Sequence, residues 1–509
     1  MNGLVLGILL MLLGLDEIVA EGHVQLRHRK IPADRGTSAV ETNRYLTLEA
    51  VVHSALESFP QVLAQHQRIK MAAGEKLSAE GGFDTIVKMY SRSSLAGKYQ
   101  NENVDVGFEQ PTDLGGASFF GGYRRGVGRY PVYEGKSETA SDGEVRAGVL
   151  IPLWRNRSID RRRATLAQAE LGQLVANHEY DQLLLDLERQ ASLRYWDWVL
   201  AGRRLAIARS LLDVARQRNL GLKARITQGD LPKVDAVENQ RAVVEREERT
   251  VAAERALEQA AIQLSLYLRT PDGEPLKPSV EDLPPGFPKA TPHPHPNTER
   301  LIDEALGHRP EIRRLEAQIQ QAEIERELAK NQKLPGVDLT LSGAQDFGVS
   351  DSPLVNRSEF YAGVIIDMPV QQRVAEGREM TSEANLERLK VERRLLEDRI
   401  QNEIRDAISA IKASDRRVGL AAEQRQLAVQ LEEGEKTRYD LGDSNLMLVN
   451  LRELATGDSA LTHAEALNSF HRSLAEFRYA LGGLGPLRED EAHHRYPVID
   501  YDFDATSVR

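Results

Sequence analysis

The chain carries an internal duplication, and this feature limits the possible folds more than any other. Residues 51–62 match residues 301–312 at an offset of 250, with the apolar positions and the proline in register. Residues 147–153 resemble residues 363–370, and aligning their prolines gives an offset of 217. Because the landmarks follow the same order in both halves, we predict two structural repeats per chain.

The offset between the halves shrinks along the chain. The turn segments 225–230 and 438–443 pair at an offset of 213. The fall from 250 to 217 places 33 additional residues in the first repeat, within the Gly-rich segment 99–142. We predict an enlarged hairpin loop there. The later fall to 213 is four residues, about one helical turn, which a coiled coil absorbs by a local change in winding.

A proline-rich connector separates the two halves. Residues 271–296 contain nine of the chain's 21 prolines, a density that excludes helix and favours extended or turn structure. The sequence therefore predicts a signal peptide (1–20), repeat one (45–270), a linker (271–297), repeat two (298–485) and a C-terminal tail (486–509).

The N-terminus has the form of an export signal. Residues 4–15 are apolar or glycine, and a secretory peptidase could cut near Ala20. No Lys or Arg precedes this run, and a misassigned start codon is an alternative explanation of that departure. No other stretch approaches 18 uninterrupted apolar residues, so we expect any membrane passage to use β-strands.

Each half is predicted to contain a helix, two strands, a very long helix, a turn and another long helix. Residues 156–220 lack proline, which allows a helix of about 100 Å. Apolar and polar residues alternate over 144–151, 337–342 and 359–368, as in half-buried strands, and less clearly over 83–98. We therefore predict four strands per chain.

Four strands cannot close a membrane barrel, because the smallest such barrels have about eight. An open sheet would leave backbone groups unpaired in lipid, so several chains must share one barrel. The same symmetry would arrange the helical hairpins in a ring that encloses a tunnel.

Over about residues 46–485 the chain resembles the TolC family of outer-membrane factors. The resemblance rests on the duplication, the Ala-Leu…Pro opening of each half, the strands that end at Pro152 or near Pro369, and the Arg-x-x-x-Gly turns at Gly229 and Gly442. It implies a mainly α fold with a membrane β-barrel: a homotrimer whose twelve-stranded barrel, four strands per chain, continues into a long α-helical coiled-coil tunnel.

The resemblance also implies a location and partners. The channel would lie in the outer membrane of a Gram-negative bacterium, in contact with outer-membrane lipid, and would extend into the periplasm. It would dock on a periplasmic adaptor (membrane fusion) protein and an inner-membrane pump, in a tripartite efflux or type I secretion system that exports drugs, metal ions or proteins.

The turns between the long helices are the predicted docking tips. Glycine supplies the positive φ that such reversals use, so a tight turn and an adaptor contact are both open for these positions. The resemblance implies that the tip contacts are Arg225, Gly229, Leu231, Arg438, Leu441 and Gly442.

The pore constriction is predicted near the second turn. In some relatives, carboxylates six and nine residues after the turn glycine form rings that favour cations, whereas the same count from Gly442 reaches Leu448 and Leu451. This departure puts cation selection by that ring in doubt, and apolar rings can gate by dewetting instead. Asp440 and Asp443 remain candidate acidic lining at the mouth.

Other polar residues carry no clear site. Asp235 and Glu238, the equivalents in the first repeat, are expected on the solvated outer surface. His463 and His471 are eight residues apart without a third ligand, so we expect surface histidines, no metal, no cofactor and no enzyme activity. A net charge of −11 argues against a nucleic-acid partner.

A soluble or periplasmic coiled-coil scaffold or adaptor is the alternative function. It would explain the helical hairpins, but it would explain neither the paired amphipathic strands nor the export signal.

Overall fold

The computed structural model describes residues 45–131, 138–227, 233–290, 297–350, 355 and 358–483, and the side chains of 223–227 are outside this description. The chain divides into two compact units, Met1–Arg44 and Tyr45–Arg509, and only the second contains described residues. The predicted signal peptide and C-terminal tail therefore lie outside the described residues.

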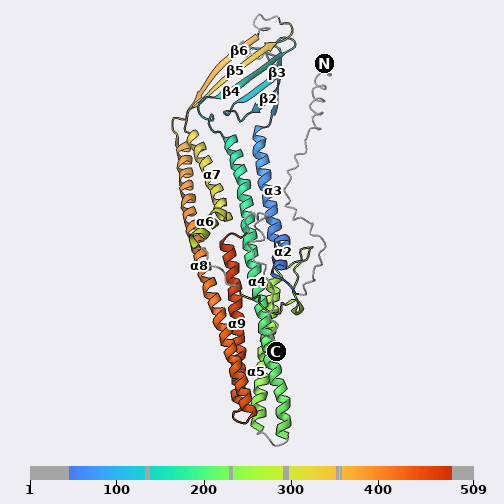
Figure 1. The fold of residues 1–509 in the computed structure, drawn as a ribbon. Helices are drawn as coiled ribbons and strands as arrows, with labels where there is room; N and C mark the ends of the chain where they lie inside the picture. Colours follow the sequence, from blue (N-terminus) through green and yellow to red (C-terminus); the bar gives the residue numbers. More distant parts are fainter. Residues whose placement is uncertain are drawn as a thin grey trace, which may run out of the picture. The chain divides into compact units, whose positions relative to one another are not determined.

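Eight α-helices make up most of the described unit (Figure 1). The two longest, α4 and α8, have 67 and 68 residues and are thus each about 100 Å long. In the first half the helices are α2 (Leu48–Ser58), α3 (Pro60–Glu80), α4 (Arg161–Thr227) and α5 (Lys233–Leu264); in the second they are α6 (Thr298–His308), α7 (Pro310–Asn331), α8 (Arg373–Asp440) and α9 (Leu446–Ala480).

The order of elements is the same in the two halves: two helices, strands, a very long helix and a long helix. Pro60 and Pro310 each occupy the first turn of the second helix, where the missing N–H costs nothing. Each proline thereby ends the preceding short helix. None of the helices in the described ranges is long and apolar enough to cross a membrane.

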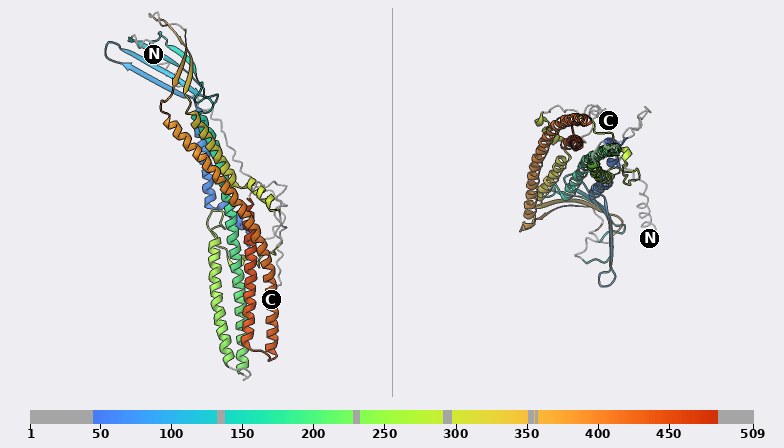
Figure 2. Two further views of the ribbon diagram at one scale, coloured as in Figure 1. Left: turned by 90° about the vertical axis from the view of Figure 1, so that its left-hand side faces the viewer. Right: turned by 90° about the horizontal axis from the view of Figure 1, so that it is seen from below.

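Four long helices lie side by side and reverse at the end away from the sheet (Figure 2). α4 packs along α5 and α9, and α8 packs along α9, whereas α5 and α9 barely touch. The row is therefore ordered α5, α4, α9, α8, with α5 and α8 at its ends.

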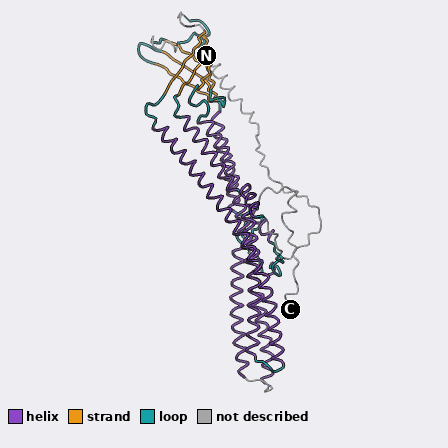
Figure 3. Tube along the Cα trace, turned by 60° about the vertical axis from the view of Figure 1, so that its left-hand side comes forward, coloured by secondary structure: helices purple, strands orange, loops and turns teal. Residues whose placement is uncertain are grey.

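A single antiparallel sheet lies beyond the other end of the helices (Figure 3). Its strands are β1 (Ile86–Ser94), β2 (Asn101–Pro111), β3 (Ser118–Gly128), β4 (Glu144–Pro152), β5 (Gly336–Asp346) and β6 (Ser358–Asp367). They pair in chain order, and the β4–β5 pairing joins the two halves of the chain.

The prediction of four strands per chain is wrong, because the segment 99–142 is not simply a loop but contains β2 and β3. The many glycines of this segment favour a loop when the sequence is read alone. In the structure several of them lie in strands, and glycines of the sheet lie opposite aromatic side chains. Phe108 faces Gly121 across the β2–β3 pair, and a Cβ at Gly121 would lie 2.8 Å from the Phe108 ring. Phe120 similarly covers Gly148 in the β3–β4 pair. The glycines make room for aromatic rings within a continuous sheet.

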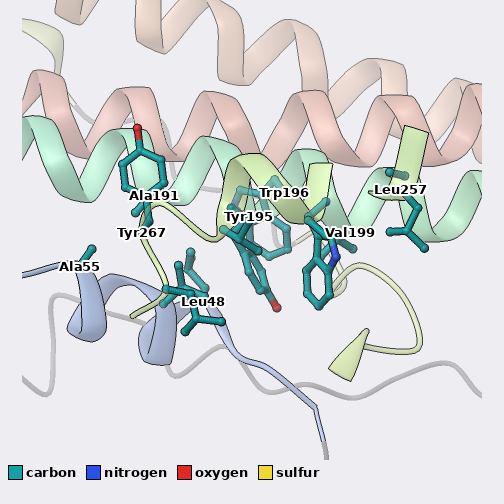
Figure 4. Packing of buried hydrophobic residues seen from close by; sticks show 14 of the residues in the cluster. Leu48, Ala55, Ala191, Tyr195, Trp196, Val199, Leu257 and Tyr267 are labelled. Atoms are coloured by element: carbon teal, nitrogen blue, oxygen red, sulfur yellow. The ribbon is translucent and has the colours of Figure 1, made fainter. Parts of the chain in front are cut away.

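The largest apolar core lies where α2, α4 and α5 meet (Figure 4). Tyr195, Trp196 and Trp198 of α4 are almost completely buried there, and the Tyr195 hydroxyl donates a hydrogen bond to the Leu46 carbonyl at 3.0 Å. A second cluster joins α6 to α8 around Ile302, Ile400 and Ile404. These cores fix the short helices of each half against the long ones.

Candidate functional site

One face of the sheet is mainly apolar, and we call this surface the apolar face. The pairing registers place alternate residues of all six strands on it, so it is defined by residue pairs such as Val87–Phe108, Val149–Leu341 and Leu339–Val364. Its large side chains are Val87, Met89, Val104, Val106, Phe108, Phe119, Tyr123, Val145, Val149, Ile151, Val337, Leu339, Leu341, Phe360, Val364 and Ile366. The pairing registers also place the charged residues Glu102 and Arg125 on it, near the ends of β2 and β3 that lie away from the β2–β3 turn.

Much of the apolar face is uncovered within one chain. Met89 at one edge is 68% exposed, and Phe360 and Ile366 at the other edge are 75% and 71% exposed. An apolar surface of this extent is rare on proteins that face only water. Its strands have 9 to 11 residues, the length that crosses a bilayer when tilted.

The opposite surface, which we call the polar face, carries charges paired across strands. Lys88 Nζ lies 2.7 Å from a Glu109 carboxylate oxygen, and Arg124 Nη2 lies 2.6 Å from Glu144. In a third pair, Arg146 donates to both oxygens of Asp105 at 2.6 and 2.8 Å. The sheet thus separates an apolar side from a charged side, as a barrel wall between lipid and water does.

The two edges of the sheet have no partner strand in the described part of the chain. β1 pairs only with β2, and β6 pairs only with β5. All residues of β6 are exposed, as are all but one of β1. Such edges invite pairing with another chain.

At the other end of the molecule, Gly442 forms the turn between α8 and α9. Its φ is +82°, a conformation that other residues rarely adopt. The Gly442 N–H donates to the Tyr439 carbonyl at 3.0 Å, and the Asp443 N–H donates to the Arg438 carbonyl at 2.8 Å. These two bonds are a Schellman motif. The predicted tight turn is confirmed at this position.

The start of α9 presents an apolar surface. Asn445 caps the helix by accepting a hydrogen bond from the Leu448 N–H at 3.0 Å. Leu448 and Leu451 are 37% and 55% exposed, and the neighbouring Met447, which is not among the predicted site residues, is 69% exposed. The exposed face continues at steps of three and four residues through Ala455, Asp458 and Thr462.

The other predicted tip residues are only partly described. Leu441, Asp440 and Asp443 are exposed, and the Arg438 guanidinium donates to the Asp443 carbonyl at 3.2 Å. Arg225 lies in α4, but its side chain is outside the described part. Gly229 and Leu231 are also outside the described residues. Adaptor docking and pore constriction stay predictions for all of these positions.

The side chains of the two acidic residues predicted on the outer surface, Asp235 and Glu238, are both half-buried. Glu238 accepts a hydrogen bond from the Arg241 guanidinium at 2.8 Å, and this contact lowers the pKa of the carboxyl group. Asp235 lies in the first turn of α5, where a carboxylate is favoured by the helix dipole.

A buried charged cluster joins the two helical hairpins, and it is not predicted from the sequence. Glu453 of α9 is 1% exposed and accepts hydrogen bonds from Arg218 of α4 and from Arg246 of α5, the latter at 2.9 Å. Arg218 also donates to Asn450 at 2.6 Å. The sequence feature that could have predicted this cluster is a glutamate at a position within the buried stripe of α9, which also contains Leu446.

The prediction of a surface position for His471 is wrong. It is 5% exposed, stacks on Trp196 at 4.3 Å and contacts the Pro288 carbonyl through Nε2 at 3.2 Å. Burial lowers its pKa to about 4. The histidine fastens the proline-rich linker to α4 and α9. Among the described residues no group of three or more His, Asp or Glu side chains is arranged to hold a metal ion.

Comparison with known proteins identifies the fold. No protein-family model matches the chain, and no curated protein matches it. Among solved structures, the outer-membrane protein VceC of Vibrio cholerae is 16% identical with a TM-score of 0.60, and the match covers 86% of this chain and 96% of VceC. The open-state channel MtrE of Neisseria gonorrhoeae is 15% identical with a TM-score of 0.60, covering 86% and 88%.

A third structure, the CmeC outer-membrane channel of Campylobacter jejuni, is 13% identical with a TM-score of 0.60, and the match covers 86% of each chain. At these identities the likeness establishes the fold. The predicted resemblance to TolC-like outer-membrane factors is therefore confirmed for the fold: this mainly helical chain with a small sheet folds like known outer-membrane channels.

Proposed function

We propose that the chain is one subunit of a homotrimeric channel in the outer membrane of a Gram-negative bacterium. In a tripartite efflux or type I secretion system, the channel conducts substrates from an inner-membrane pump across the periplasm and outer membrane. The observation that carries this proposal is the sheet: its exposed apolar face and charge-paired polar face continue into helices about 100 Å long.

The sheet edges favour a wall built from several copies. Six strands are too few to close a membrane barrel, whose smallest examples have about eight. An edge left unpaired in lipid costs several kcal/mol for each backbone group. Copies related by a rotation axis remove both edges, and the resemblance to TolC-like channels favours three copies.

The helical row supports the same assembly. α5 and α8 end the row, and each has an exposed apolar stripe with a seven-residue repeat, as coiled-coil seams have. Val237, Val244 and Val251 on α5 are 57% to 68% exposed, and Leu420 and Leu427 on α8 are 57% and 53% exposed. Packing α8 of one copy against α5 of the next covers both stripes and closes a helical tunnel.

The helical tips are proposed to dock on a periplasmic adaptor. Leu441 is 79% exposed beside the rigid Gly442 turn, so the turn holds an apolar side chain in solvent. Such a contact is suited to another protein rather than to the chain's own core. Leu448 and Leu451, on the exposed face of α9, are the proposed constriction.

Adjacent residues of β6 provide a matched test of membrane insertion. Ile366 lies on the apolar face and Ile365 on the polar face, and they are 71% and 58% exposed. Lysine facing lipid costs about 2–4 kcal/mol at the bilayer centre and about 0–1 kcal/mol near the interfaces, and Ile366 is the last residue but one of β6. We therefore expect I366K to reduce the outer-membrane yield up to about fivefold relative to I365K.

The readouts are density-gradient separation of the membranes and a heat-modifiable, trimer-sized gel band. The proposal fails if the unmodified protein is a soluble periplasmic monomer, or if I365K and I366K behave alike. A coiled-coil scaffold, the alternative function, would give that result. The scaffold offers no reason for the exposed apolar face.

A further inference from the structure

We propose that the β2–β3 hairpin is part of the barrel wall, so that each copy contributes six strands and three copies form an eighteen-stranded barrel. In this barrel β1 of one copy pairs with β6 of the next. The inference rests on the proposed trimer, and it differs from the twelve-stranded barrel that the resemblance implies.

The hairpin is paired along both of its sides. β2 pairs with β1 from Asn101 to Glu109, and β3 pairs with β4 from Ser118 to Arg124. A hairpin that extended away from the sheet as a loop would leave β1 and β4 to pair with each other. Here β1 and β4 are separated by two complete strands.

The hairpin also continues both faces of the wall. Val106 and Phe108 lie on the apolar face, in register with Met89 and Val87 of β1. A loop in water needs no such alternation, whereas a strand between lipid and lumen does.

Charge pairs attach the hairpin to its neighbours on the polar face. Glu109 of β2 pairs with Lys88 of β1 at 2.7 Å. Asp105 of β2 pairs with Arg146 of β4 at 2.6 Å, and this contact passes over Gly122 of β3, which lies opposite Arg146 in the register. Gly122 has no side chain to block it. The ion pair therefore bridges three strands.

The free edges fit each other in direction and in pattern. Six antiparallel strands leave β1 and β6 running in opposite directions, so β6 of one copy meets β1 of the next as an antiparallel pair. Both edges alternate in the same way, with Met89 and Ile366 on the apolar face and Tyr90 and Ile365 on the polar face. Because barrel diameter grows roughly in proportion to strand number, the lumen would be about 1.5 times wider than that of twelve strands.

The chain has no cysteine, so introduced cysteine pairs report strand neighbours directly. Gly363 lies on the polar face of β6 with nothing within 4 Å of an added Cβ. We combine G363C with a polar-face cysteine on β1, using K88C, Y90C or R92C in turn, because one chain does not fix the register between copies. Within one chain β1 and β6 are five strand spacings apart, about 24 Å, so a disulfide can form only between chains.

Matched controls combine G363C with F120C or R124C, on the polar face of β3. We expect oxidation to convert at least one β1–β6 pair into covalent dimers and trimers on a denaturing gel, and neither β3–β6 pair. All variants are first checked for the heat-modifiable trimer band under reducing conditions.

Cross-links from β3 but not from β1 would overturn the inference, because β1 and β2 would then lie outside a twelve-stranded wall. A disulfide within one chain between M89C and V145C or V149C, read as loss of maleimide labelling, would also overturn it. β1 and β4 become neighbours only when the β2–β3 hairpin lies outside the wall, whereas in the proposed wall they are three strand spacings apart, about 14 Å. Membrane-inserted trimers without a link from any β1 position would also overturn it. Protein that stays soluble and monomeric would refute the proposed channel itself, which is a separate outcome.

Discussion

The buried Glu453 cluster gives a sharp test of what holds the two helical hairpins together. Glu453 and Arg246 are 1% and 2% exposed and lie 2.9 Å apart, and Arg218 is a second donor to the same carboxylate. Replacing Glu453 by glutamine keeps the shape but leaves two guanidinium groups facing a neutral amide. Removing one partner of a buried ion pair costs about 3–5 kcal/mol, and because glutamine still accepts a hydrogen bond we expect about 3 kcal/mol.

Native-state hydrogen exchange of the trimer measures this cost locally. A loss of about 3 kcal/mol in the free energy of opening accelerates exchange about 150-fold, since each 1.4 kcal/mol is a factor of ten. We expect the acceleration at α9 amides around Glu453 and at the facing part of α4. Amides near the sheet, far from the substitution, should not change.

The control is an exposed ion pair between α4 and α5, the two helices of the first hairpin. Arg209 and Glu254 lie 2.8 Å apart, but their side chains are 51% and 48% exposed. Exposed pairs contribute about 0–1 kcal/mol, so E254Q should accelerate exchange less than about fivefold. The triple variant R218M/R246M/E453L should recover much of the E453Q loss, because apolar replacement of all members of a buried ion cluster is often neutral or stabilising. Exchange in E453Q at the unmodified rate would refute the reasoning.

Three further predictions concern the pore, the turn and the linker. Replacing Leu448 and Leu451 with serine should raise single-channel conductance in planar bilayers, because the polar rings would keep the constriction hydrated. Unchanged conductance would show that these residues do not form a gate. G442A should cost about 1 kcal/mol and speed exchange about fivefold at the α8–α9 turn, since φ is +82° but an added Cβ meets nothing within 4 Å. His471 has a folded-state pKa of about 4, below the usual 6.5, so the unfolded state takes up the proton first as the pH falls. Stability should be full above about pH 6.5 and fall by about 3 kcal/mol towards pH 4. The measurement is the denaturation midpoint against pH, and H471Q should remove that dependence.

The sequence predicts the helices well because their signals are local and long. The predicted span 156–220 corresponds to α4, and the predicted turn before Leu446 is the Gly442 motif. Proline-free length and glycine at a reversal are both visible without tertiary contacts.

The strands β2 and β3 are missed because their glycines have a cause that only the pairing reveals. Gly121 and Gly148 are covered by phenylalanine rings from neighbouring strands, a relation that depends on register. The burial of His471 is missed for a similar reason: Phe287 and Pro288, which cover it, come from the linker.

In the proposed channel, the charges of the sheet and of the helical tips have different consequences. Lys88, Arg124 and Arg146 each face a carboxylate within 2.7 Å on the polar face, so these pairs add little net field to the lumen. Near the tip, Asp440 and Asp443 are exposed beyond the Leu448 position, and Asp458 lies on the same face of α9 deeper in the helical row. An apolar ring with carboxylates on both sides would delay passage by dewetting while still concentrating cations at each end. Any selection of ions by charge should therefore depend on the helical tips. A wider barrel with eighteen strands should leave this selection unchanged.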